Sequence, residues 1–225
     1  MRYRPDVVYE MDLTIDLWAK RYSATVRPVG GARVTLANNY AFRGGQAEAD
    51  KIAWFAWSAP RDSLLVGTVE PRPAPDRLIS VETWEEAWLW NTGRRFTVGY
   101  DVTPSRPDVD AVTGLANQSA DAHTDLAAIV RFAPDGLIDA RHDGKYRAET
   151  RMPYHAGVSY HVRLTVDLDA KRYSAVVTPA GGTPRKIADG YLFRREQAQA
   201  KALDVFAVYC AGGGAAEVAR VWSKR

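Results

Sequence analysis

The sequence is poor in several features that would point to common classes of protein. A single cysteine, Cys210, excludes an intrachain disulfide, and its place in the apolar run VFAVYC predicts a buried, inert thiol. No apolar run approaches the roughly 20 residues that cross a bilayer, so we expect no membrane partner. The opening MRYRPDVVYEMD lacks the apolar core of a signal peptide. We therefore expect an extracellular location only if the chain is a fragment of a longer exported protein.

Clusters of charge and of metal ligands are also scarce. The net charge is +3, but basic and acidic residues are interspersed, so we expect no nucleic-acid partner. The four histidines are scattered, and the glycine-rich AGGGAAE lacks the Lys-Ser/Thr pair of a phosphate-binding loop. We expect no cofactor and no catalytic metal, while a structural calcium stays open as an alternative.

What the sequence does contain is an internal repeat. A shift of 151 residues aligns residues 9–56 with 160–207 without a gap, and 24 of the 48 pairs are identical. In both copies, YEMDLTID or YHVRLTVD and RYSATVRP or RYSAVVTP alternate between apolar and polar residues, which is the period of β-strands. A short polar turn joins the two runs, as in a hairpin. The duplication predicts the same strands in both copies.

Four repeated polar residues have a simple structural interpretation. Asp16 and Asp167 begin the hairpin turns, where an aspartate can accept hydrogen bonds from the backbone amides of its own turn. We prefer this role to catalysis or metal binding. Arg43 and Arg194 follow an aromatic residue in YAFR and YLFR, and we expect each to pair with a carboxylate of the fold.

The rest of the chain is also typical of β structure. A proline-rich break at residues 71–76, PRPAPD, predicts a linker, and strands separated by turns such as TPSRPD, PDG and HDG follow from Arg95. This spacing indicates a sandwich or jelly roll. In strand order and turn placement, the run from FTVGYDVTP to YLFR resembles a concanavalin A-like jelly-roll module, over about residues 94–225. Such modules accompany secreted bacterial polysaccharide-degrading enzymes, so the resemblance implies two packed antiparallel sheets and an association with glycans.

The expected fold class is therefore all-β: a concanavalin A-like jelly-roll β-sandwich with a duplicated half-module at the N-terminus. Residues 1–72 correspond to a second half-module without its first half, and residues 73–225 to a complete module. An unpaired half-sandwich exposes an apolar face. We expect residues 77–93, or a second copy in a homo-oligomer, to cover this face, which includes Trp54 and Phe55. A truncated tandem protein and one enlarged sandwich both remain open.

Aromatic residues favour glycan binding, because their faces can pack against the C–H faces of sugar rings. Three of the seven tryptophans lie in VETWEEAWLWN. Trp84, Trp88 and Trp90 would share one face of a strand, and Trp84 and Trp88 one face of a helix. The alternative is that they fill the gap between the two units. Three other tryptophans are expected in the core: Trp54, Trp57 and Trp222.

The segment YRAETRMPYHAGVSY supplies further candidates. Arg147, Arg151 and Tyr154 combine charge with aromatic area, and with the three tryptophans above they form the predicted substrate-binding set. The segment also loosely resembles the YxKAGxY strand of jelly-roll alginate lyases, with His155 where the lysine would fall. That resemblance implies a Tyr or His base and an Arg that neutralises a uronate carboxylate. The QIH-type strand of those lyases is missing.

We therefore expect no catalytic residue. The expected function is a non-catalytic glycan-binding or structural accessory module of a polysaccharide-active protein, with a polysaccharide or oligosaccharide as partner. A polysaccharide lyase or related carbohydrate-active enzyme is the alternative, and a pure spacer is a third interpretation. The glutamates near the linker are assigned to a solvated charged face rather than to a catalytic pair: Glu82, Glu85 and Glu86.

Overall fold

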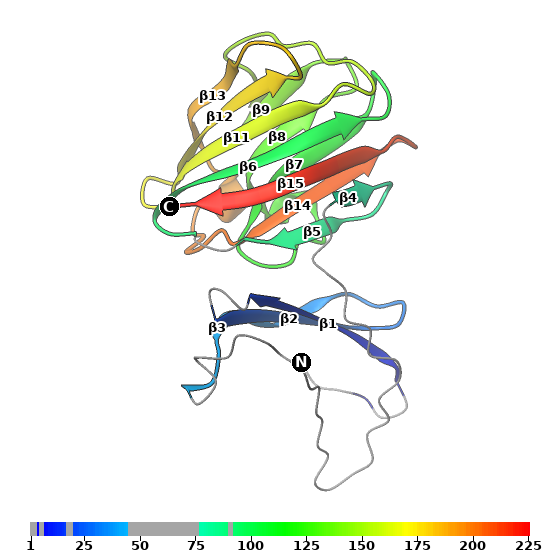
Figure 1. Cartoon of the computed structure of the whole chain (residues 1–225), viewed down its shortest axis with the longest axis vertical. Coiled ribbons are helices and arrows are strands. Elements are labelled where there is room, and N and C mark those ends of the chain that lie inside the picture. Colours follow the sequence, from blue (N-terminus) through cyan, green and yellow to red (C-terminus); the bar gives the residue numbers. More distant parts are fainter. Residues whose placement is uncertain (1–3, 5–6, 17–19, 45–76, 90–91) are drawn as a thin grey trace, which may run out of the picture.

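The computed structural model describes residues 4, 7–16, 20–44, 77–89 and 92–225, and every structural statement below concerns these residues. They form two six-stranded antiparallel sheets packed as a sandwich and a separate three-stranded sheet (Figure 1). This architecture confirms the expected concanavalin A-like β-sandwich in its coarse form. The proposed boundary between residues 72 and 73 lies outside the described residues and stays a prediction. No helix in the described part is long and apolar enough to cross a membrane.

One sheet of the sandwich, here called the β6 sheet, has the strand order β13-β12-β11-β6-β15-β4. Its strands, from one edge to the other, are β13 (Arg185–Leu192), β12 (Arg172–Pro179), β11 (Tyr160–Asp167), β6 (Arg95–Pro104), β15 (Ala216–Lys224) and β4 (Arg77–Ser80).

The other sheet, here called the β7 sheet, has the order β10-β9-β8-β7-β14-β5. Its strands are β10 (Lys145–Arg147), β9 (Ile138–His142), β8 (Leu126–Phe132), β7 (Asp110–Ala116), β14 (Val205–Ala211) and β5 (Glu85–Trp88). Two short 3-10 turns flank it, η2 (His123–Asp125) and η3 (Arg195–Gln197). The strand β5 settles the local structure around Trp84 and Trp88, for which the sequence allowed a strand or a helix.

The core lies between the two sheets, because alternate side chains of each strand point inward. In β11 the inward residues Val162, Leu164 and Val166 are buried and the residues between them are exposed. Polar groups inside the core are paired: the hydroxyls of Tyr100 and Thr113 lie 2.8 Å apart across the sandwich. A buried polar group without a partner would cost free energy, so this pair keeps the core stable.

The third sheet, here called the N-terminal sheet, reproduces three strands of the β6 sheet. Its strands are β1 (Tyr9–Asp16), β2 (Arg21–Pro28) and β3 (Val34–Ala41), and each bound lies 151 residues before that of β11, β12 or β13. The pairing registers agree as well, including the irregularities in the second pair of strands. The predicted duplication is thus confirmed for the described part of the repeat.

The two copies also agree at an irregularity within the third strand of each, where the pairing register shifts. Asn39 and Gly190, which correspond in the repeat, have φ values of 54° and 60°. Their amides donate to the hydroxyls of Ser23 and Ser174, each at 2.9 Å. Asp167 caps its turn as expected, since its carboxylate accepts from the amide of Ala170 at 2.9 Å. The side chain of Asp16 lies outside the described part.

The two copies differ in what surrounds them. In the second copy β11 pairs with β6, whereas β1 is an edge strand among the described residues. Met11, Leu13 and Ile15 are 56%, 44% and 42% exposed, although their counterparts in β11 are buried. For these residues the expected burial against residues 77–93 is wrong. Burial by a second copy is not tested, and Trp54 and Phe55 lie outside the described residues.

Candidate functional site

The outer face of the β7 sheet has apolar side chains that lie buried beneath other residues. It carries a second apolar cluster of Val112, Ala116, Ala120, Leu126, Ile129, Val205 and Ala207. Four half-buried aromatic residues pack against this cluster: Trp84, Trp88, Tyr146 and Tyr209. The outer face of an antiparallel sheet is often solvated and polar. On this sheet the four half-buried aromatic residues are therefore the part of the apolar face that a ligand could contact.

Three rings form a compact group at the β5 side of this face, here called the Trp84 cluster: Trp84, Tyr209 and His123. Trp84 stacks on Tyr209 with 5.0 Å between ring centroids and 30° between planes. His123 meets each of these rings edge-on at 5.4 Å. Burial lowers the pKa of His123, so its imidazole is neutral at pH 7. A ligand at the Trp84 cluster would therefore meet aromatic rings and, beside them, the uncharged imidazole of His123.

A charged group lies at the β10 side of the same face. The Arg131 guanidinium binds the Asp139 carboxylate through two bonds of 3.0 and 2.6 Å and lies 3.9 Å from the centre of the Tyr146 ring. Arg141 lies over the same ring at 4.9 Å. Burial raises the pKa of Tyr146, so its phenol stays protonated and can donate a hydrogen bond. It is not suited to act as a base.

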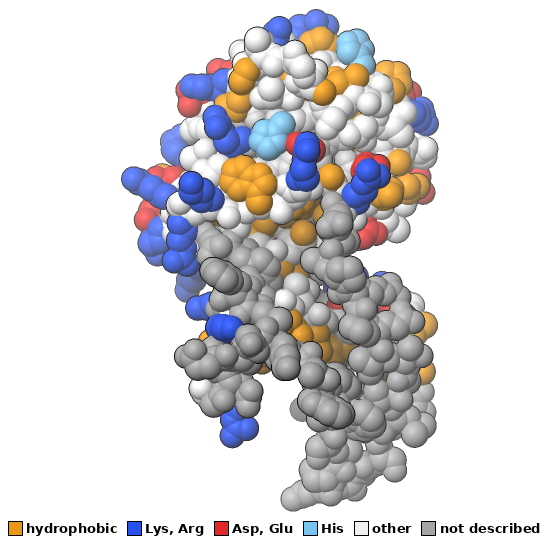
Figure 2. Space-filling model, viewed as in Figure 1, with side chains coloured by type: hydrophobic (Ala, Val, Ile, Leu, Met, Phe, Trp, Pro, Cys, Tyr) orange, Lys and Arg blue, Asp and Glu red, His pale blue; other side chains and the backbone are white. Residues whose placement is uncertain are grey.

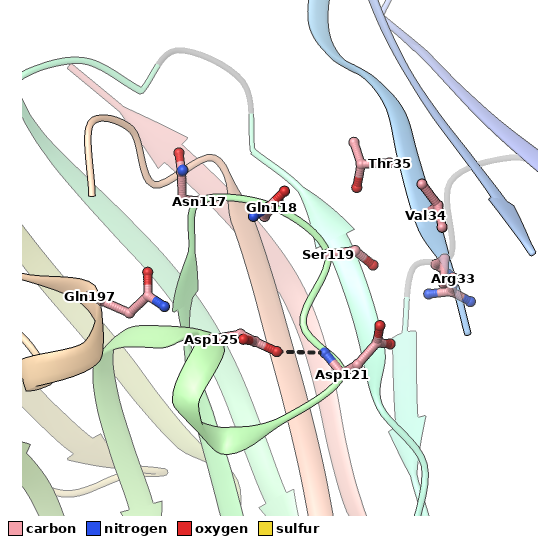
Figure 3. Close-up of a pocket in the computed structure, with 9 residues that line it drawn as sticks. All are labelled: Arg33, Val34, Thr35, Asn117, Gln118, Ser119, Asp121, Asp125 and Gln197. Carbon is pink, nitrogen blue, oxygen red and sulfur yellow. Dashed lines mark hydrogen bonds between the residues drawn. The ribbon is translucent and has the colours of Figure 1, made fainter. Parts of the chain in front are cut away.

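A polar hollow of about 340 Å³ opens beside the Trp84 cluster (Figure 3). Figure 3 shows residues 33–35 of the N-terminal sheet facing the loop between β7 and β8 across this hollow. Amide, hydroxyl, carboxylate and guanidinium groups line it: Arg33, Thr35, Asn117, Gln118, Ser119, Asp121, Asp125 and Gln197, together with the apolar Val34. The Asp125 carboxylate accepts from the amides of residues 121 and 122 at 3.0 and 2.9 Å, which fixes the loop.

Glu86 of β5 fixes the position of the loop between β7 and β8. Its carboxylate accepts from the Ser119 hydroxyl at 2.9 Å, from the Ala120 amide and from Arg33 at 3.4 Å. The side chain is 6% exposed, so for Glu86 the expected solvated face is wrong. Burial raises the pKa of this carboxyl, and the bonds from Ala120 and Ser119 oppose the shift.

A second contact joins the N-terminal sheet to the same loop. The Asn38 amide donates to the Asn117 carbonyl at 3.1 Å and to the Asp204 carboxylate at 3.2 Å. Asp204 is 5% exposed, and burial raises its pKa. Two largely buried carboxylates, Glu86 and Asp204, therefore bind the N-terminal sheet to the sandwich through Arg33 and Asn38.

The structure separates the six residues predicted to bind substrate. Trp84 and Trp88 lie on the outer face of the β7 sheet, and Trp90 lies outside the described residues. Arg147 lies over the ring of Tyr191, 4.7 Å from its centre, and the exposed Arg151 follows in a loop.

Tyr154 is 2% exposed. Its hydroxyl lies 2.9 Å from the Ala133 carbonyl oxygen and 3.1 Å from that of Val109. Burial raises its pKa to about 12. In this structure Tyr154 is a structural residue that a ligand at the surface cannot reach.

Several residues of this face were missed by sequence reasoning: His123, Arg131, Tyr146 and Tyr209. The alternation of VFAVYC places Tyr209 opposite the inward-facing Phe206 and Val208, and this signal could have found it. Among the described residues there is no group of three or more His, Cys, Asp or Glu that could hold a metal ion.

Comparison with known proteins finds sequence similarity to part of a larger protein. No family model matches the chain. A gellan lyase from a Bacillus species is 27% identical over 194 residues, which cover 84% of this chain but only 7% of that protein. The chain is thus partly homologous to this gellan lyase and spans only a small part of its length.

Solved structures with a similar sandwich include a sialidase and a plant lectin. The sialidase aligns with a TM-score of 0.46 at 12% identity, over 66% of this chain and 15% of its own. Lectin I-B4 from Griffonia simplicifolia aligns with a TM-score of 0.41 at 11% identity, over 63% and 78%. Likeness at this level says nothing about activity.

Proposed function

We propose that this chain is a non-catalytic glycan-binding module of a polysaccharide-active protein and that the outer face of the β7 sheet contacts the sugar. The observation that carries the proposal is the stacked pair Trp84 and Tyr209 beside a hollow lined with hydrogen-bonding groups. Flat aromatic faces pack against the C–H faces of a sugar ring, and a few placed polar groups orient its hydroxyls. Partial homology to a gellan lyase supports a polysaccharide as the ligand.

The two parts of the site are continuous. The short turn η2 carries His123 in the Trp84 cluster at one end and Asp125 in the hollow at the other. A sugar ring stacked on Trp84 can therefore extend a neighbouring ring toward Gln118 and Asp121. Such an arrangement suits an oligosaccharide of more than one unit rather than a free monosaccharide.

Binding is favoured over the lyase alternative by the state of the tyrosines. A general base must reach the proton that it abstracts. Tyr154, the base implied by the lyase resemblance, is buried and its pKa is raised to about 12. Tyr146 on the β7 sheet also has a raised pKa. Neither phenol is suited to lose a proton to a substrate at neutral pH.

The test is isothermal titration of the chain with gellan oligosaccharides. Trp84→Ala and Tyr209→Ala should each weaken binding about tenfold or more, because each removes half of the stacked pair. Tyr40→Ala is the matched control, since Tyr40 is an exposed aromatic residue of the N-terminal sheet, 55% exposed. It should bind as the parent protein does.

Thermal melting of each variant shows whether it is folded. A folded Trp84→Ala variant that binds gellan oligosaccharides like the parent chain would refute the site. Release of an unsaturated uronate product, followed by absorbance, would show catalysis and replace the non-catalytic proposal with the lyase alternative.

A further inference from the structure

The opposite face of the sandwich carries a second aromatic residue in an unusual position. Trp222 of β15 was expected in the core, but it is 41% exposed on the outer face of the β6 sheet. Its indole lies directly against Gly99 of β6, where a Cβ atom would overlap the ring. Glycine at this position lets the indole lie flat on the sheet, and the other side of the ring faces solvent.

Strand register shows which side chains surround this ring. Gly99 pairs with Trp222 on one side and with Arg163 of β11 on the other, so Arg163 and the indole lie in one row across the sheet. In the next row toward the β15 C-terminus, Thr97 pairs with Lys224. Both Arg163 and Lys224 are exposed, and they flank the ring with positive charge.

The row of side chains on the opposite side of the indole contains Asp101, a carboxylate that two basic side chains contact. Asp101 is 5% exposed. One of its oxygens lies 2.8 Å from Nδ1 of His161, and the other contacts Arg220. Because these two partners occupy Asp101, it does not offset the cations beside the ring. Figure 2 shows basic side chains, a histidine and hydrophobic surface on the face turned to the viewer, with a few acidic side chains among them.

We propose that these residues bind a sugar that bears a carboxylate, such as a uronate unit of an acidic polysaccharide. The group, here called the Trp222 face, consists of Arg163, Trp222, Lys224, His161 and Arg220. The indole would stack on the ring, and the Arg163 guanidinium would bind the carboxylate through two parallel hydrogen bonds, for which its planar fork is suited. This second site lies on the other sheet and does not share residues with the Trp84 cluster.

The test uses trigalacturonate and its methyl ester as probes, because they share a backbone and differ in charge. Arg163→Gln should weaken trigalacturonate binding at least tenfold and leave ester binding unchanged. Trp222→Ala should weaken both, since it removes the stacking surface. Lys186→Gln is the matched control: Lys186 is an exposed cation of the same sheet, paired with Asp189 at 2.9 Å, and its loss should change neither affinity.

The outcome separates this site from the one proposed above. If folded Trp222→Ala and Arg163→Gln variants bind trigalacturonate like the parent chain, the Trp222 face is not a sugar site, whatever Trp84→Ala shows with gellan. Tighter binding of a short oligothymidylate than of trigalacturonate would also overturn the proposal, in favour of a surface for single-stranded nucleic acid.

A second inference comes independently from the repeat. In the second copy, all eight residues of β11 pair with β6, from Tyr160 with Val102 to Asp167 with Arg95. Strand β1 has the same length and the same alternation, but no described strand lies on its free edge. The edge therefore retains the geometry of a strand acceptor, which unpaired strands readily provide.

The charges on β1 indicate what kind of strand would fit. On β11 the outward residues His161 and Arg163 face Asp101 and Gly99 of β6. Their counterparts on β1 are Glu10, which also pairs with Arg27 at 2.6 Å, and Asp12, so acidic residues stand where the second copy has basic ones. Opposite charges in facing positions stabilise a strand pair, and like charges destabilise it.

We infer that the free edge of β1 accepts an antiparallel strand of another polypeptide, with apolar residues toward Met11 and Leu13 and basic residues facing Glu10 and Asp12. Two peptides test this by fluorescence anisotropy: the β6 sequence RFTVGYDVTP and the same peptide with Gly99→Lys and Asp101→Lys. The lysine peptide should bind at least tenfold more tightly and should slow amide hydrogen exchange in β1.

Three results would overturn the inference. Equal or absent binding of the two peptides would remove the charge argument. Because β1 pairs with β2, only the β1 amides that face the free edge are informative, and slow exchange of these amides in the free chain would show that a segment of the chain itself covers the edge. A dimer in sedimentation experiments that the lysine peptide does not dissociate would assign the edge to a second copy.

Discussion

At the scale of single residues, burial decides what each polar group can do. Glu86 belongs to a run of glutamates that looks solvated in the sequence, yet it is enclosed by Arg33, Ser119 and the backbone of Ala120. Tyr154 shows the same effect, because the hydroxyl of this candidate base is buried and bonds to two backbone carbonyl groups. The candidate site therefore relies on groups that remain at the surface, such as Trp84.

The raised pKa of Glu86 predicts how stability depends on pH. Its folded-state pKa lies above the ordinary value, so the folded chain holds this proton more tightly than the unfolded chain. Stability should fall as the pH rises from below the ordinary pKa of glutamate to above the folded-state value. Glu86→Gln should reduce this fall, measured by urea denaturation between about pH 4 and pH 7.

Glu10→Gln is the control for that experiment, because Glu10 is an exposed glutamate of the N-terminal sheet and pairs with Arg27. If the pH dependence is the same in Glu86→Gln as in the parent chain, the buried carboxyl does not titrate as described. The raised pKa of Asp204 acts in the same direction, so part of the fall should remain in the variant.

At the scale of elements, the two copies of the repeat show the same backbone conformation with different residues at one position. The same left-handed position is occupied by Asn39 in the first copy and by Gly190 in the second. Left-handed backbone costs most side chains about 1 kcal/mol or more, and Asn tolerates it better than most residues. The backbone geometry at this irregularity of the strand, rather than the residue type, is therefore what the duplication has kept.

This comparison predicts a graded effect at residue 190. Gly190→Ala should lower the free energy of unfolding by about 1 kcal/mol, since no heavy atom lies closer than 4.0 Å to an added Cβ and only backbone strain remains. Gly190→Asn should lose less, because the first copy uses Asn at this place. Denaturant unfolding measures both.

Gly144→Ala is the control, because nothing lies within 4 Å of a Cβ at that position and its φ is not left-handed. It should leave stability within about 0.5 kcal/mol of the parent chain. Equal losses for Gly190→Ala and Gly190→Asn would contradict the strain argument.

At the scale of the whole molecule, the sandwich presents two outward faces of different character. The outer face of the β7 sheet combines stacked rings with a hollow that both acidic and basic groups line, whereas the Trp222 face combines one indole with cations. The N-terminal sheet contributes residues to the first face alone, because Arg33 bonds to Glu86 of β5 and Asn38 bonds to the loop between β7 and β8. A polymer long enough to pass around the sandwich could contact both faces, while a short oligosaccharide would occupy one.

The sequence by itself determined the strands and their duplication, because alternation and turn residues act over a few neighbours and were preserved in both copies. It also identified Trp84 and Trp88 as surface candidates. Only the tertiary structure decided which face each strand buries and which distant loops meet. It placed Tyr209 and His123 beside Trp84, buried Tyr154 and Glu86, and exposed Trp222 over Gly99. Burial depends on contacts between residues far apart in the chain, and a local pattern does not specify those contacts.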